Sequence, residues 1–285
     1  EDLRTEALAS AKRVVEAAAR RLPRKAILFA DIERFDRPSR DFAVDIARSA
    51  RERGYTVIIT GETETIVPWI GVLPLKPLSA ESTKALLGEL VPEETSLEGA
   101  GAMSSGSPAH IEQLAAWLCE ERLMQQAPST LVDLISQRIL RAPAQSRVLI
   151  QALAALGGSA PLARLEALIP GVELHSVPAL VTVDAQAARL CSRLIIQVAL
   201  ACTPADARRR LHRAAAEHCR DEAPVIRARH AQQAEDFEKA YSMFMMAGHD
   251  AFSRFDSTGA ARLYGLAADC ARALLRRGHQ SSQRD

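Results

Sequence analysis

The chain has 285 residues, more than one small hydrophobic core needs, and this length predicts two to four modules. Hydrophobic residues make up 48% and charged residues 25%, which is typical of a soluble globular protein, and the abundance of Ala, Leu and Arg favours helices. A formal net charge of +1 excludes nucleic-acid or membrane binding through overall charge, and five cysteines without zinc-binding spacing indicate reduced thiols in the cytoplasm.

The first part of the chain alternates helical patterns with short apolar runs. In order, we expect an amphipathic helix over 3–22, a buried strand over 26–30, a helix over 38–53, a β-branched strand over 56–60 and a weaker strand over 71–76. Short, continuous apolar runs suit parallel strands that are covered on both faces. A strand, a helix and a strand in succession form a βαβ unit, so the chain is predicted to begin with an α/β module.

Helical patterns dominate after Ser79, which is a good N-cap for a helix over 79–90. Further helices are expected over 107–123, from 128 onward, over 144–156 and, in several segments, over 204–277. Residues 159–203 have a mixed pattern that fits a small winged-helix hairpin around 177–183. Recurrent alanines in the last part let antiparallel helices approach closely, as helical-repeat arrays require.

The clearest motif lies where the first predicted strand ends. Apolar residues 27–30 lead into Asp31, and Glu33 and Asp36 follow within a short loop. A carboxylate at the carboxyl end of a parallel strand faces the crevice where ligands bind. The segment 27–36 resembles the Walker B strand of STAND ATPases, AAA-like regulators of bacterial signal transduction. The resemblance implies that Asp31 is catalytic and holds magnesium, with Glu33 and Asp36 as further candidates for contact with the cofactor.

Other segments resemble motifs of the same family in the same order. They are Leu75-Lys76-Pro77-Leu78-Ser79 before the lid helices, Gly106-Ser107-Pro108 near the adenine, Leu131–Arg138 at the start of a winged helix, Arg189–Ile195 with Arg208–His212 before the helical repeats, and a tetratricopeptide-like tail from 227 to 275. The resemblance therefore covers most of the chain, and it implies that Gly106 and Pro108 contact ATP.

The resemblance predicts a mostly α fold with an N-terminal partial α/β domain of the P-loop NTPase type. Its expected domains are a partial NTPase-like domain over 1–78, a helical lid over 79–126, a winged-helix-like module over 127–203 and tetratricopeptide-like helices over 204–285. Because the first residue is Glu1, we expect the chain to begin within a longer protein.

The sequence departs from the family at three places. Ala30 stands at the first acid position of the Walker B strand, Glu64 stands where an Arg is expected, and no G-x-x-x-x-G-K-[ST] phosphate loop occurs. In the family that loop lies upstream, and its strand sits between the strands predicted at 56–60 and 71–76. We therefore expect an unpaired strand edge within residues 26–76. ATP and Mg²⁺ are expected for the full-length protein, with none bound by this chain alone.

Structural alternatives stay open at the candidate residues. Asp31 is either a functional carboxylate or an ordinary Asp that caps a loop after a strand. Pro108 either contacts adenine or merely begins a helix, where proline is favoured. His110 is expected at the surface or in the lid rather than as a ligand, and Arg208–Arg210 are expected on a solvated helix face.

Nucleotide-gated signalling is the function that the sequence predicts. ATPase activity would require a P-loop upstream, and the helical tail would bind protein partners and bias the switch for an effector domain elsewhere in a longer chain. The alternative is a non-catalytic scaffold derived from an NTPase, which the residues Ala30 and Glu64 favour. A winged-helix DNA binder is the third class, but the chain lacks the basic face that phosphate contacts need.

Overall fold

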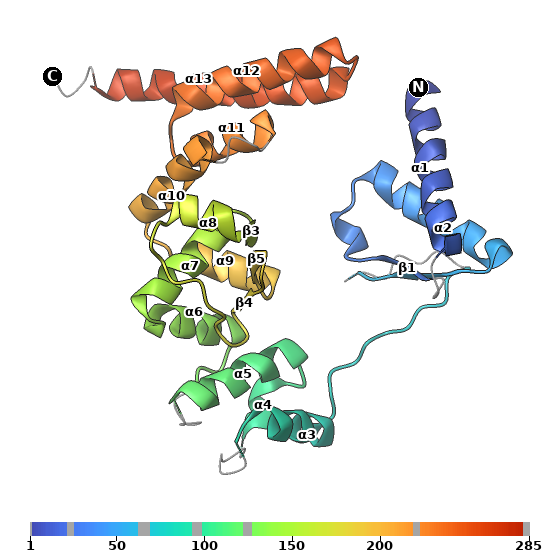
Figure 1. The fold of residues 1–285 in the computed structure, drawn as a ribbon, viewed down its shortest axis with the longest axis vertical. Coiled ribbons are helices and arrows are strands. Elements are labelled where there is room, and N and C mark those ends of the chain that lie inside the picture. Colours follow the sequence, from blue (N-terminus) through green and yellow to red (C-terminus); the bar gives the residue numbers. More distant parts are fainter. Residues whose placement is uncertain are drawn as a thin grey trace. The chain divides into compact units, whose positions relative to one another are not determined.

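The computed structural model describes residues 2–21, 26–61, 69–92, 99–121, 127–218 and 223–281. These residues are mostly helical, with two small sheets, as the composition predicts (Figure 1). They divide into two compact units, residues 1–75 and 76–285, so the first boundary falls three residues before the one predicted at 78. Within the described ranges, no helix is both long and apolar enough to cross a membrane.

The first unit contains a parallel pair of strands and two long helices. Its elements are α1 (Asp2–Arg21), β1 (Ala26–Phe29), the 3-10 helix η1 (Ile32–Arg34), α2 (Arg37–Arg53) and β2 (Thr56–Ile59). Strand β1 pairs in parallel with β2, from Ala26 opposite Thr56 to Phe29 opposite Ile59. Both predicted strands and the βαβ connection between them are thus confirmed.

Helices α1 and α2 pack on one face of this sheet (Figure 1). Ile46 and Ala50 of α2 are buried against Ile27 and Val57 of the strands. Ion pairs also join the two helices, and the one between Glu16 and Arg53 has an O···N distance of 2.5 Å. Apolar packing and charge pairing therefore both fix this helical layer.

The other face of the sheet carries apolar side chains that nothing described covers. Leu28 and Ile58, which are opposite each other in the register, are 62% and 50% exposed. The predicted strand at 71–76 is wrong: these residues are in irregular structure, and Leu73 and Leu75 are exposed. A strand needs a neighbour for its ladder hydrogen bonds, and these residues have no such neighbour within the described part of the unit.

The second unit begins with three helices within residues 79–126, the range in which helices were predicted. They are α3 (Ala80–Leu90), α4 (Ala100–Ser104) and α5 (Pro108–Glu121). Ser79 caps α3 as predicted, because its side-chain oxygen accepts a hydrogen bond from the Ser82 N–H. Leu87, Ile111 and Trp117 form the centre of a buried apolar cluster between α3 and α5.

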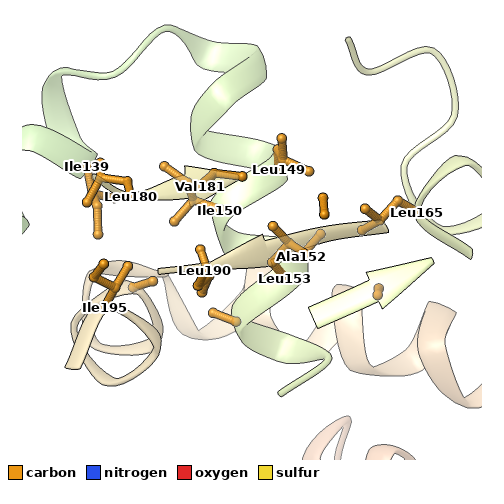
Figure 2. Close-up of a cluster of buried hydrophobic side chains, with 14 of the residues drawn as sticks. Ile139, Leu149, Ile150, Ala152, Leu153, Leu165, Leu180, Val181, Leu190 and Ile195 are labelled. Carbon is orange, nitrogen blue, oxygen red and sulfur yellow. The ribbon is translucent and has the colours of Figure 1, made fainter. Parts of the chain in front are cut away.

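The largest core of the second unit surrounds a three-stranded antiparallel sheet. The elements are α6 (Leu131–Arg141), α7 (Ala144–Ala155), β3 (Ser159–Pro161), α8 (Leu162–Leu168), β4 (Val181–Val183), β5 (Ala187–Leu190) and α9 (Arg193–Cys202). The strand order is β3-β5-β4. Figure 2 shows inward-facing side chains of the sheet, such as Val181 and Leu190, together with Leu149 and Leu153 of α7.

The predicted hairpin lies further along the chain than the sequence pattern indicated. It is formed by β4 and β5 over residues 181–190 instead of 177–183. Residues 177–180 form a turn before β4, and the Val177 and Val181 backbones form an isolated bridge. The apolar residues of the turn were mistaken for a strand because burial in this core, like pairing in a sheet, selects apolar side chains.

Four helices complete the second unit. They are α10 (Ala205–His218), α11 (Pro224–Gln233), α12 (Phe237–Ser253) and α13 (Ser257–Ser281), and α12 and α13 run side by side (Figure 1). Buried alanines such as Ala228 and Ala240 let neighbouring helices approach closely. His212 of α10 and His230 of α11 are buried, and their Nδ1 atoms are 3.0 Å apart.

Candidate functional site

Asp31 lies at the carboxyl end of β1, as predicted. Its backbone is left-handed, with φ of 55°, and its N–H donates to Thr60 Oγ1 over 3.1 Å. The next N–H, that of Ile32, donates to the Thr60 carbonyl oxygen over 2.8 Å. These two bonds turn the chain away from the sheet, so the Asp31 carboxylate is placed at the edge where parallel strands end.

The Asp31 carboxylate already has a cationic partner. Arg34 Nη1 is 3.1 Å from Asp31 Oδ2, and both side chains are about half exposed. An exposed ion pair of this kind contributes at most about 1 kcal/mol of stability, so a stronger ligand can displace Arg34. Asp31 is therefore accessible, but its negative charge is balanced within its own loop.

The other two predicted carboxylates have different surroundings. Glu33 lies against Gly61, where an added Cβ would be 2.9 Å from Glu33 Oε2, and so faces the end of β2. Asp36 is the N-cap of α2, because its Oδ1 accepts from the Ser39 N–H over 2.8 Å. Among the residues that the structure describes, no three His, Cys, Asp or Glu side chains are grouped to hold a metal ion. Asp36 therefore has a structural role that the sequence analysis did not assign to it.

Gly106 and Pro108 lie in the second unit, where two of the predicted motifs meet. The Leu78 N–H donates to the Gly106 carbonyl oxygen over 2.9 Å. Gly106 has φ of +72°, and a Cβ there would lie 2.4 Å from the Leu78 carbonyl oxygen, so only glycine allows this approach. The starts of α3 and α5 are consequently joined, with Pro108 as the first residue of α5.

Two buried polar atoms without a hydrogen-bond partner lie near this junction. They are Thr83 Oγ1 in the first turns of α3 and His110 Nε2 in the first turn of α5. His110 is only 6% exposed, which excludes the surface position considered for it, and burial lowers the pKa of its imidazole. A neutral imidazole and a hydroxyl can each donate or accept a hydrogen bond, and both atoms are enclosed within the second unit.

The predicted site residues thus form two sets, one in each unit. Asp31 and Glu33 lie at the strand ends of the first unit, and Gly106 and Pro108 lie at the helix junction of the second. Glu64, the residue at the family's Arg position, lies outside the described residues. Sequence reasoning missed Thr60 and Thr83, although a Thr that ends an apolar run is a signal that could have singled out Thr60.

Comparison of the chain with protein-family models, with curated proteins and with solved structures found no match. The resemblance to STAND ATPases consequently rests on the motifs of the sequence alone.

Proposed function

We propose that this chain is part of a nucleotide-dependent signal-transduction regulator of the STAND type. One observation carries the proposal: the two lid motifs, which are 27 residues apart in the sequence, touch through the Leu78–Gly106 hydrogen bond. Pro108 begins α5 beside this contact, where the resemblance implies contact with adenine.

The position of Asp31 supports the same proposal. It follows a strand of a parallel sheet, at the edge where α/β proteins bind their ligands. The residues present do not by themselves make a magnesium site, because Asp31 is paired with Arg34 and Asp36 caps α2. Magnesium and the phosphates of ATP would need the phosphate loop that residues 1–285 lack.

A non-catalytic scaffold is the second candidate. The Arg34 ion pair and the Asp36 cap favour it, because both leave the carboxylates engaged without any nucleotide. In this alternative the strand-end loop is a relic of the NTPase, and the helices α10–α13 bind a protein partner.

Calorimetric titration of ATP, with and without Mg²⁺, into the complete natural protein that contains this chain distinguishes the two candidates. We expect Pro108→Ala to weaken binding about tenfold, equivalent to about 1.4 kcal/mol, through loss of a contact with the base. Asp31→Ala should remove the dependence on Mg²⁺. The matched control is Pro224→Ala, since Pro224 also begins a helix but lies in α11. Absence of ATP binding by the wild-type protein would leave the scaffold as the better account.

A further inference from the structure

Arg138 of α6 is a buried cation that links three segments of the second unit. Its side chain is 0% exposed. Its Nη2 is 2.5 Å from Glu120 Oε1, at the end of α5, and 2.7 Å from the carbonyl oxygen of Pro178. Its Nη1 donates to Gln113 Oε1, also in α5. All three guanidinium nitrogens take part, since Nε also donates to Glu120 Oε2 over 3.1 Å, whereas an ammonium has a single nitrogen.

Gln113 extends this network to the next residue of the same turn. Its Nε2 donates to the Ala179 carbonyl oxygen over 2.5 Å. Ala179 has φ of 52°, a left-handed conformation that costs a residue with a Cβ about 1–2 kcal/mol. Two side chains from α5 and α6 therefore hold two successive carbonyl groups of a strained turn. We call Arg138, Gln113 and Glu120 the Arg138 cluster.

The turn that the cluster holds is directly connected to the sheet of the large core. Leu180, the residue after Ala179, points into this core beside Ile139 of α6 (Figure 2). Strand β4 begins at Val181, and the Leu180 carbonyl oxygen accepts from the Cys191 N–H at the end of β5. Any displacement of the turn must consequently move the end of the β4–β5 hairpin.

Stability alone is a poor reason for burying such a cation. Ion pairs lose their hydration when buried, and apolar residues of similar volume often stabilise a fold as well. A strained backbone held by side chains from other elements is instead a feature of segments with two arrangements. The Arg138 cluster combines both features at one turn.

We propose that the Arg138 cluster is a latch that holds residues 177–180 and the start of β4 against α5 and α6. When the latch releases, the turn leaves its strained conformation and the hairpin end opens, while the α7–α9 core stays folded. This inference goes beyond the proposed function, because the latch operates whether or not a nucleotide binds. It makes Arg138 the residue through which α5 and the hairpin move together.

Cys191 provides a local reporter of the latch. Cys191 is an exposed residue as a whole. Burial of its thiol and the nearby Glu112 nevertheless raise the pKa of that thiol, while Arg138 lowers it. Opening of the hairpin end would hydrate the thiol and speed its alkylation. Cys119, which is exposed in α5, serves as an internal reference for the reagent.

The test compares Arg138→Lys with wild type by hydrogen–deuterium exchange of the full chain, resolved by peptide, with iodoacetamide alkylation of Cys191 in parallel. Lysine keeps the charge, but its single nitrogen cannot occupy the three positions from which the guanidinium nitrogens donate. We expect exchange in 177–183 to accelerate at least tenfold and Cys191 alkylation to accelerate relative to Cys119, with exchange in 149–155 unchanged. The matched control is Arg189→Lys in β5, because Arg189 forms an exposed ion pair with Asp184 and should change neither signal.

Two results would overturn the latch. One is a rate of hydrogen–deuterium exchange in 177–183 that is the same in Arg138→Lys as in the wild type. This would mean that the cluster does not restrain the turn. The other is equal acceleration in 149–155 and 177–183, which would make Arg138 a general stabiliser of the core. If Arg138→Lys does not fold, Glu120→Gln decides in its place, since Glu120 is 38% exposed and tolerates substitution. For Glu120→Gln we expect a smaller acceleration of hydrogen–deuterium exchange, and this acceleration must be confined to residues 177–183.

Discussion

The two sheets of this protein share an alternating pattern of burial but differ in what their outer faces carry. In β4 and β5 the outward residues are polar, as at Thr182 and Arg189, and the inward ones are buried in a large core. In β1 and β2 the outward residues include Leu28 and Ile58, and the inward ones are only partly buried. Antiparallel sheets commonly leave one face in water, whereas parallel sheets are normally covered on both faces.

This difference separates a sheet with a polar outer face from a sheet with an apolar outer face. The outer face of β4–β5 has side chains that water solvates well, so it needs no cover. The Leu28–Ile58 face has the composition of a second core layer, and the exposed Leu73 and Leu75 belong to the same unit. An apolar sheet face without a described cover predicts that core substitutions affect the two units unequally.

The largest expected effect comes from deleting buried methyl groups in the second unit. Leu153→Ala removes a fully buried side chain of the large core and should lower the free energy of unfolding of that unit by about 2–5 kcal/mol. Leu28→Ala, on the exposed face of the first unit, should cost less than about 1 kcal/mol.

Each unit contains one tryptophan, so the two transitions can be followed separately. Guanidinium unfolding of Leu153→Ala is monitored by Trp117 in a Trp69→Phe background, and that of Leu28→Ala by Trp69 in a Trp117→Phe background. Equal losses of unfolding free energy in Leu153→Ala and Leu28→Ala would show that the sheet face with Leu28 is already covered. This result would contradict the difference between the two sheets.

A second pair of substitutions compares positive-φ glycines in the two units. Gly106→Ala should cost about 2–4 kcal/mol, because a left-handed Ala is strained and its Cβ would overlap the Leu78 carbonyl group. Gly54→Ala, after α2, has the same kind of strain but open space around it and should cost about 1 kcal/mol. The same two fluorescence assays measure both changes. A Gly106 cost no larger than that of Gly54 would mean that the α3–α5 junction is loose.

The last comparison of the two units is made through pH, because the histidine pair His212 and His230 lies buried in the second unit. Burial, with the charges of His230 and Arg208, lowers the pKa of His212 to about 4, below its ordinary value of 6.5. Between about pH 6.5 and pH 4 the unfolded chain therefore binds a proton at His212 that the folded chain does not bind. The free energy of unfolding consequently falls as the pH falls from about 6.5 toward 4. Between pH 7 and pH 5 this linkage lowers the free energy of unfolding by about 2 kcal/mol.

Urea unfolding followed by Trp117 at pH 7 and pH 5 measures that loss. His212→Gln should reduce the pH dependence and leave the part that comes from the buried His110, while the control His249→Gln, at an exposed histidine of α12, should keep all of it. An unchanged slope in His212→Gln would assign the acid sensitivity to other groups.

Features that depend on neighbouring residues in the chain were predictable. The strands β1 and β2, the cap of α3 by Ser79 and the position of Asp31 after β1 follow from local patterns, because capping bonds and side-chain periodicity act over three or four residues. The two segments of the candidate site, Asp31–Asp36 and Gly106–Pro108, were likewise singled out from their residues alone, and their role in ligand binding stays a prediction.

Only the tertiary structure decided features that need a partner far along the chain. Residues 71–76 have a strand-like composition but no neighbouring strand, so they stay irregular. The contact of Leu78 with Gly106, the pairing of His212 with His230 and the burial of Arg138 depend on how helices pack, and no local pattern encodes which distant group a side chain meets. A polar residue on a helix carries the same sequence signal whether it faces water or a buried partner, and for this reason the contacts of Arg138 with α5 and with the turn follow only from the fold.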